Sequence, residues 1–276
     1  MPDKKIKHFI FMRFFSSKKA DYPYDIYDVT FLTKQLLLAK NNALSSLENQ
    51  TNKNFDLVFI TNPKFFDNPK YEFVFSALQY ATTLPLKFIK VNEMSSLVKN
   101  ALKEYDFVIY SRMDLDDFIF KNAIADTHSK VAECDNILAY GYCRGYSYIW
   151  GELYEHYRLW KGVGHHSVLQ SLILKTSFAK NLPILSIYNP HPTIKTFLKK
   201  FLDDNGLTFS ENMFKQNTST NAYIYFRHEF SLDQFVEKSH NPLKPPKNKE
   251  PITSADITKK QLADEFGFHL KLNSIK

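Results

Sequence analysis

Three aspartates, Asp114, Asp116 and Asp117, lie within four residues in the segment RMDLDDF. They directly follow an apolar run typical of a strand, and in open α/β sheets ligands gather beyond the carboxyl ends of the strands. Carboxylates this close repel one another and need compensation. Mg²⁺ or Mn²⁺ supplies it, because these ions bind carboxylate oxygens and also neutralise charge on a departing diphosphate. The cluster therefore predicts a site for a metal ion and a diphosphate.

An acidic strand-to-loop turn offers a simpler interpretation, in which the aspartates cap a following helix at about 121–133. Arg112 stands beside the cluster and could either contact phosphate or pair with the local acids. The apolar strand before the motif, the third aspartate and the adjacent arginine together favour the ligand-binding interpretation.

The first half of the chain alternates strand-like and helix-like segments. Apolar, β-rich runs at 7–15, 55–61 and 106–114 are the expected strands. Between the first two, apolar residues recur at helical spacing from Phe31 to Leu47, which predicts a crossover helix. A short strand at 86–91 and a helix N-capped by Ser95 complete an α/β pattern with a largely parallel, covered sheet.

The second half is less regular. We expect one strand or a hairpin at 136–150, a helix at 165–178, strands at 182–188 and 221–230, and a helix between these two that ends at Gly206. The stretch 240–251 has the composition of a linker. Beyond it, Thr258 and Gln261 form a capping box for a short helix that ends before Gly267. The predicted domains are 1–238, catalytic, and 239–276, a linker with a short helical tail.

Three segments resemble the rhamnosyltransferase-like group of GT-A glycosyltransferases. They are RFF at 13–15, the stretch at 31–61, and YSRMDLDD at 110–117, of which the last is the specific element. The resemblance implies a GT-A fold, Rossmann-like, with a mixed, mainly parallel sheet flanked by helices. It also implies a pocket for a nucleotide-diphosphate sugar. Arg13, Arg112 and Asp114 would contact the nucleotide, and Asp114, Asp116 and Asp117 would face Mn²⁺ or Mg²⁺.

GT-A enzymes often add a late histidine to the metal, and the resemblance assigns this position to His228. Here Arg227 and Glu229 flank the histidine, where the family more often follows it with glycine and asparagine. His191, between two prolines, is the rival ligand, whereas the pair at 165–166 could contact an acceptor or phosphate.

Inverting transfer requires a carboxylate that deprotonates the acceptor hydroxyl. Glu152 occupies about the right place in chain order for such a base, with Glu155 second. The alternative for either is an exposed helix acid. Rhamnosyl-type relatives suggest inversion, and a retaining enzyme would need no such base.

Alternating aromatic residues mark the stretch YGYCRGYSYIW at 140–150. As a strand it places Tyr140, Tyr142, Tyr146, Tyr148 and Trp150 on one face. Burial of that face is a simpler account than stacking on a sugar acceptor. Arg144 and Gly145 within it predict a bend or bulge.

Composition narrows the class of protein. The chain has 276 residues and a formal charge of +7, which favours anionic partners. Nucleic acid is not expected among them, because no basic stripe in the sequence carries interleaved aromatic residues. No apolar run is long enough to span a bilayer, and the N-terminal stretch is expected to be a strand and not a signal peptide. Two cysteines fit a cytoplasmic protein, with peripheral binding to the inner face of a membrane as a further expectation.

The sequence therefore predicts a metal-dependent glycosyltransferase that moves a sugar from a nucleotide-diphosphate donor to a glycan or lipid-linked acceptor. Synthesis of bacterial surface polysaccharide is the expected setting. One alternative is a non-catalytic subunit that binds nucleotide sugars or glycans. A phosphohydrolase is less favoured, because its aspartate motif would lie near the N-terminus and carry Thr or Val after the second aspartate, whereas DLDDF lies mid-chain.

Overall fold

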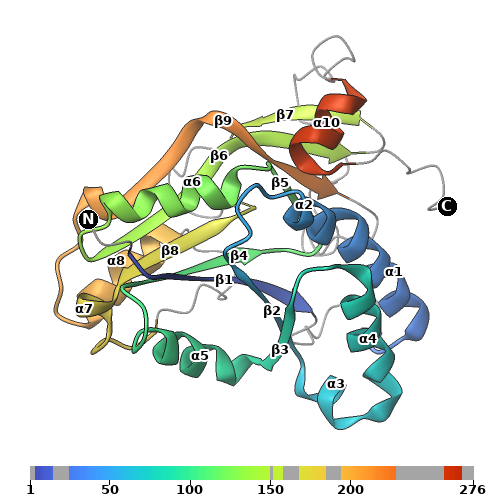
Figure 1. Ribbon diagram of the computed structural model, residues 1–276, viewed down its shortest axis with the longest axis horizontal. Coiled ribbons are helices and arrows are strands. Elements are labelled where there is room, and N and C mark those ends of the chain that lie inside the picture. Colours follow the sequence, from blue (N-terminus) through green and yellow to red (C-terminus); the bar gives the residue numbers. More distant parts are fainter. Residues whose placement is uncertain are drawn as a thin grey trace, which may run out of the picture.

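A single nine-stranded sheet forms the centre of the computed structural model, with helices on both sides (Figure 1). The structure describes residues 4–14, 25–149, 152–157, 168–184, 194–227 and 258–268. The strand order is β3-β2-β1-β4-β8-β6-β9-β5, and β7 pairs with β6. The strands are β1 Ile6–Phe14, β2 Asp56–Thr61, β3 Leu86–Lys90, β4 Phe107–Met113, β5 Phe118–Ile119, β6 Ile137–Ile149, β7 Glu152–Tyr157, β8 Gln170–Lys175 and β9 Phe214–Arg227.

The first half of the chain builds the parallel part of the sheet. The expected strands are all present, and β3, β2, β1 and β4 run parallel and side by side. Beyond β4 the sheet is mixed, because β8 is antiparallel to β4 and β6, whereas β9 is parallel to β6. The predicted α/β class, a mixed sheet flanked by helices, is confirmed.

The helices between these strands are short. They are α1 Val29–Ala39, α2 Ser45–Glu48, α3 Pro63–Asp67, α4 Glu72–Ala81, α5 Met94–Ala101, α6 Ala123–Ser129, α7 Thr176–Ala179, α8 Ile194–Asp204 and α10 Lys259–Phe266, with 3-10 turns at Pro69–Tyr71, Val91–Glu93, Lys130–Glu133 and Glu211–Met213. Ser95 lies inside α5 and is not its N-cap, so that prediction was wrong. The 3-10 turn before α5 starts the helix instead, and there the Lys90 N–H donates to Glu93.

The predicted crossover helix is present, but it widens in the middle. Asp28 caps α1 by accepting a hydrogen bond from the Phe31 N–H, and α1 leads through a π-helical segment, η1 at Lys40–Leu44, into α2. Short π segments within α-helices are rare and occur frequently at functional sites. This one carries the buried side chain of Asn42.

The helix expected at 165–178 is mainly a strand where the structure describes it, and only its last residues are helical. Its residues form β8, a central strand between β4 and β6, followed by the single turn α7. Leu172, Ile173 and Leu174 are all buried, because a central strand is covered on both faces. Such a continuous apolar run cannot be distinguished from a buried helix by its periodicity.

Other predictions for the second half have mixed outcomes. The helix before Gly206 is α8, and Gly206 has a φ of 69°. The strand predicted at 221–230 coincides, as far as residue 227, with the end of a longer strand, β9. Residues 228–230 of the predicted strand lie outside the described residues. The segment 182–184 is not a strand, and 185–188 lies outside the described residues.

The aromatic stretch at 140–150 is a core strand, as its alternation predicts. β6 pairs with β7 as a hairpin, and its register against β9 shifts on both sides of Arg144. The extra residues lie in β9, between Asn217 and Ile224, so the irregularity is opposite Arg144 and not within β6 as predicted. Tyr140, Tyr142 and Tyr148 are buried, and Tyr146 packs against the same core. Trp150 lies outside the described residues.

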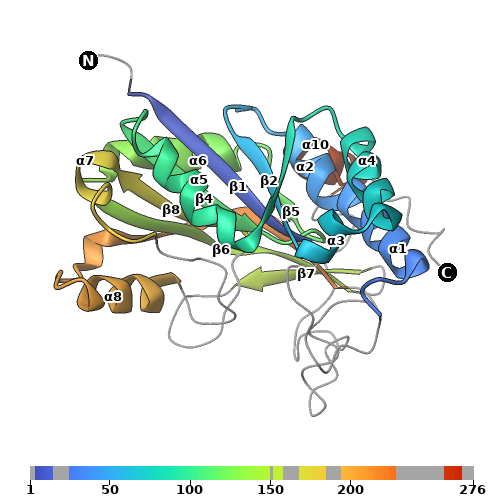
Figure 2. The same ribbon diagram turned by 90° about the horizontal axis from the view of Figure 1, so that it is seen from below.

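Two layers of apolar side chains cover the sheet. The α1, α4, α6 and α10 helices pack on one face, which we call the α6 face. On the opposite face, which we call the α8 face, α5 and α8 cover the apolar part (Figure 2). Each strand of the centre thus sends alternate side chains into two different environments.

The C-terminal helix forms as predicted and joins the core. Thr258 and Gln261 make the capping box, and the helix ends at Gly267 with a φ of 67°. Phe268 is buried, and its ring packs edge-on against Phe118 at a centroid distance of 4.9 Å. The described end of the tail is therefore part of the core, although the boundary proposed at 238/239 stays a prediction.

Candidate functional site

The acidic residues form a turn at the carboxyl end of β4. All seven residues of β4 are buried, and the strand ends at Met113. Residues 114–117, which we call the acidic turn, reverse into the short strand β5. β5 pairs antiparallel with β9 through Phe118 and Ile224. A buried strand on one side and a paired strand on the other thus fix the acidic turn at the edge where ligands bind in α/β sheets.

Asn42 fixes the main chain of the acidic turn through a hydrogen bond. Its side-chain Nδ2 donates a hydrogen bond to the main-chain carbonyl of Asp116 at 2.8 Å, and Asn42 is only 4% exposed. The π-helical segment therefore presents a buried amide to the acidic turn, a contact that links residues 74 positions apart in the chain. Sequence analysis did not find this residue.

Two arginines form ion pairs with the same aspartate at the carboxyl ends of β1 and β4. Arg13 near the end of β1 lies 3.2 Å from Asp114 Oδ1, and Arg112 near the end of β4 lies 3.1 Å from Asp114 Oδ2. β1 and β4 are parallel neighbours, so their carboxyl ends bring these side chains together. We call this group the Arg-Asp-Arg triad; two guanidinium groups on one carboxylate give it a net positive charge.

The interpretation of the aspartates as helix caps does not fit the structure. The N-cap of α6 is Asn122, which makes no side-chain capping bond. Instead, Gln50 Oε1 accepts a hydrogen bond from the Ile124 N–H at 3.1 Å. A buried glutamine from the end of the crossover helix thus caps α6.

The aspartates differ in exposure. Asp117 is 2% exposed, whereas Asp114 and Asp116 are partly exposed. Within the described part of the chain, no three His, Cys, Asp or Glu side chains lie close enough to form a complete metal site. Mg²⁺ does not require one, because it usually keeps several waters and binds through one or two carboxylates plus substrate phosphates. The partly exposed carboxylates therefore fit such an ion when a diphosphate completes its shell.

Several predicted site residues cannot be placed. His228, His191 and the pair at 165–166 lie outside the described residues. Glu152 is the first residue of β7, paired with Ile149 of β6, but its side chain lies outside the description, as does that of Glu155. Of the predicted site residues, Arg13, Arg112 and Asp114 are brought into direct contact.

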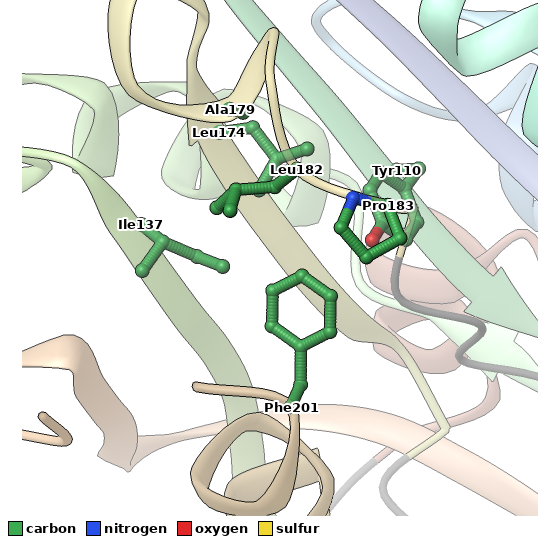
Figure 3. A pocket seen from close by; sticks show the side chains of 7 residues that line it. All are labelled: Tyr110, Ile137, Leu174, Ala179, Leu182, Pro183 and Phe201. Carbon is green, nitrogen blue, oxygen red and sulfur yellow. The ribbon is translucent and has the colours of Figure 1, made fainter. Parts of the chain in front are cut away.

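A small pocket on the α8 face lies away from this site (Figure 3). Apolar side chains of β6, β8, α7 and α8 line it together with the ring of Tyr110. Of its strand residues, Tyr110 lies nearest to the site, two residues before Arg112 in β4 and roughly 7 Å from it along the strand. Ile137 and Leu174, which pair with each other, lie a further two residues away along their strands. A lining with so few polar groups offers no chemistry for group transfer.

Comparisons with known proteins give only distant likenesses. No family model matches the chain, and no curated protein sequence matches it. Among solved structures, the chain is similar to residues 1–349 of TarS from S. aureus, with 12% identity, a TM-score of 0.36, and coverage of 80% of this chain and 60% of that one.

Two further structures cover more of their own length. One is described as a nucleotide-diphospho-sugar transferase from Desulfovibrio desulfuricans, with 12% identity, a TM-score of 0.41, and coverage of 81% of this chain and 82% of that one. The other is a cytidylyltransferase from Leptospira borgpetersenii, with 10% identity, a TM-score of 0.39, and coverage of 79% and 77%. Likenesses this distant assign no activity, which has to come from the residues of the site.

Proposed function

We propose that the chain is a glycosyltransferase that uses a nucleotide-diphosphate sugar and a divalent cation. The observation that carries the proposal is the Arg-Asp-Arg triad beside the acidic turn, at the carboxyl ends of two parallel strands. This arrangement offers both charges that a metal-bound diphosphate needs, guanidinium groups for phosphate oxygens and carboxylates for the cation.

Arg13 and Arg112 are the proposed phosphate ligands. In the described structure they converge on Asp114, which balances part of their charge and fixes the direction of both guanidinium groups. Arginine binds phosphate through parallel N–H donors, so two arginines held side by side suit the oxygens of a diphosphate. Hydrogen bonds from both arginines would stabilise the negative charge that develops on the departing nucleoside diphosphate.

Asp114 and Asp116 are the proposed metal ligands, with Asp117 and His228 as further ligands. When bound, Mg²⁺ or Mn²⁺ would act as a Lewis acid toward the phosphate oxygens. The chain's own part is to hold the acidic turn in place, which Asn42 and the pairing of β5 with β9 do. Glu152, at the start of β7, remains the proposed base for the acceptor hydroxyl.

A glycan or lipid-linked acceptor, in the synthesis of a bacterial surface polysaccharide, remains the proposed setting. Among the described residues, no helix combines the length and the apolar character needed to cross a bilayer. The charge of +7 supports peripheral binding to anionic lipid as part of the proposal.

Donor hydrolysis tests the proposal and separates an enzyme from a non-catalytic binder. The full chain, incubated with nucleotide-diphosphate sugars and Mn²⁺, should release nucleoside diphosphate slowly even without an acceptor. The Asp116→Asn variant should lose this activity by about 100-fold or more, because a ligand of the cation is neutralised. Released diphosphate is measured in a coupled assay.

Asp106→Asn is the matched control, because Asp106 directly precedes β4 at the opposite end of the strand from the acidic turn. It should keep the activity of the unmodified chain. If no donor in the panel is turned over although nucleotides bind, the chain is a binding protein and the enzymatic proposal is wrong.

A further inference from the structure

A row of polar residues crosses the α8 face of the sheet next to the acidic turn. Cross-strand pairing aligns Arg112 of β4 with Gln170 of β8, Gln170 with Gly141 of β6, and Gly141 with Gln216 of β9. Directly paired residues point to the same face of a sheet. We call Arg112, Gln170, Gly141 and Gln216 the polar row.

The neighbouring row on the same face is entirely apolar or aromatic. Two residues away along each strand, Tyr110 pairs with Leu172, Leu172 with Ala139, and Ala139 with Phe214. All four belong to the core under α5 and α8 or pack against it. Across β4, β8, β6 and β9 the face therefore changes from apolar residues to the polar row in one step, whereas on the β1 side Arg112 pairs with the buried, apolar Phe11.

The polar row contains one buried hydrogen-bonding group without a partner among the described residues. Gln216 Nε2 is buried, and it has no hydrogen-bond partner in the described structure. Gln170 lies in a central strand and is only 8% exposed. A buried amide donor without a partner costs stability, so its presence calls for a ligand or another explanation.

We propose that the polar row is the subsite for the hydroxyl groups of the transferred sugar. This inference rests on the proposed function. Glutamine amides both donate and accept hydrogen bonds, which matches hydroxyl groups that do the same. With neighbouring strands about 4.8 Å apart, the two glutamines are roughly 10 Å apart, and Gly141 places no side chain between them. Arg112 links the row to the diphosphate, so a sugar joined to that diphosphate would extend over Gln170 and Gln216.

The test compares nucleoside diphosphates with their sugar conjugates. Binding of uridine, guanosine, thymidine and cytidine diphosphates and of their hexose conjugates to the full chain is measured by calorimetry with Mn²⁺. The affinity gained from the sugar is the ratio of the two dissociation constants. In Gln216→Met and Gln170→Met, this gain should fall by roughly two- to tenfold, as for loss of one neutral hydrogen bond. Affinity for the diphosphate itself should stay within twofold.

Asn221→Leu is the matched control on the same strand. Asn221 also has a buried amide atom without a partner among the described residues, but its Nδ2 donates to Tyr146, which packs in the core of the α6 face. This variant should keep the full gain from the sugar. Gln216→Met should also melt no lower than the unmodified chain, because an apolar group of similar shape replaces an unpaired donor.

The outcomes separate the two proposals. If the diphosphates bind but the glutamine variants keep the full gain, or the unmodified chain shows none, the sugar subsite is wrong and the proposed function stands. A clear drop in the melting temperature of Gln216→Met would show that its amide is structural and would also contradict the subsite. If no nucleotide binds the unmodified chain, the proposed function fails and the subsite with it.

Discussion

Ser111 and Arg112 are neighbours in β4, yet their side chains lie on opposite faces of the sheet and meet different surroundings. Ser111, on the α6 face, lies 2.8 Å from His8 Nε2 and 2.6 Å from the hydroxyl of Ser171. His8 Nδ1 lies 3.1 Å from His128 of α6. These four residues, which we call the closed polar chain, give the buried groups of His8, Ser111 and Ser171 partners, and the partly exposed His128 also lies 3.4 Å from Asn52 Nδ2.

On the α8 face, β4 and β9 carry polar groups with different surroundings. Arg112 pairs with the partly exposed Asp114, and the amide Nε2 of Gln216 finds no partner within the described chain. A closed group stabilises the fold, whereas an open one costs stability until a ligand completes it. We propose that this contrast distinguishes the polar residues that stabilise the fold from those that bind the ligand.

The largest effect is expected at Arg112. Replacing it with Met should weaken nucleoside diphosphate binding by about 10- to 100-fold, because charge-assisted hydrogen bonds to phosphate are lost. The affinity of Arg112→Lys should lie between those of the unmodified chain and of Arg112→Met, because lysine keeps the charge but lacks the paired donors. Calorimetry with Mn²⁺ gives both affinities. Unchanged binding in Arg112→Met would show that the arginine serves only Asp114 and would break the contrast.

Ser111→Ala should lower the stability of the fold without changing nucleotide affinity. Loss of its hydroxyl leaves His8 and Ser171 without a shared partner in the buried chain, so the free energy of unfolding should fall by about 1–3 kcal/mol. Nucleotide affinity should not change. Urea denaturation provides the measurement, and Ser129→Ala, which removes an exposed hydroxyl bonded to Asp126, is the control. A loss of affinity without a loss of stability in Ser111→Ala would contradict the assignment.

The closed chain should also make stability depend on pH. Burial, and secondarily His128, lower the pKa of His8 well below 6.5, and burial lowers the pKa of His128. The unfolded chain therefore takes up protons that the folded chain does not, and stability present above pH 6.5 is lost as the pH falls below it. Each histidine contributes a slope of up to about 1.4 kcal/mol per pH unit.

His8→Gln isolates this effect, because it removes one titrating group and leaves the remaining ones. Its unfolding free energy should vary less with pH between 6.5 and 5 than that of the unmodified chain. Equal slopes in the two proteins would show that folding does not lower the pKa of His8 and would contradict this account.

Asn42 should have the smallest effect on stability but a selective one on binding. Asn42→Ala and Asn49→Ala each remove one amide donor to a main-chain carbonyl, of Asp116 at 2.8 Å and of Asp264 at 3.1 Å. Each should cost about 1 kcal/mol of unfolding free energy. Only Asn42→Ala should also weaken Mn²⁺-dependent nucleotide binding, by roughly threefold, because only Asn42 positions the acidic turn. Equal affinities in the two variants would reduce Asn42 to a structural role.

Local patterns predicted the position of the acidic turn and both ends of the C-terminal helix. Apolar runs revealed the four strands of the first half, so the position of Asp114 at a strand end followed directly. The capping box at Thr258 and the helix end at Gly267 depend on neighbouring residues, and both are observed.

Contacts that depend on distant pairing could not be predicted. Gln170 belonged to an expected helix, which would never have aligned it with Arg112 and Gly141. Even with β8 recognised, a shift of one residue in its pairing would move Gln170 to the other face. Asn42 reaches Asp116 only through the packing of the π-helical segment against the acidic turn, and no local signal marks that contact.

The most direct test of the central claim is a thermal-shift experiment with nucleoside diphosphates, with and without Mn²⁺. A ligand that binds the folded state raises its melting temperature. The proposed metal and diphosphate site predicts that at least one diphosphate raises the melting temperature of the unmodified chain when Mn²⁺ is present, and that Asp116→Asn abolishes this shift. A shift that needs neither Mn²⁺ nor Asp116, or no shift with any nucleotide, would contradict the proposed site.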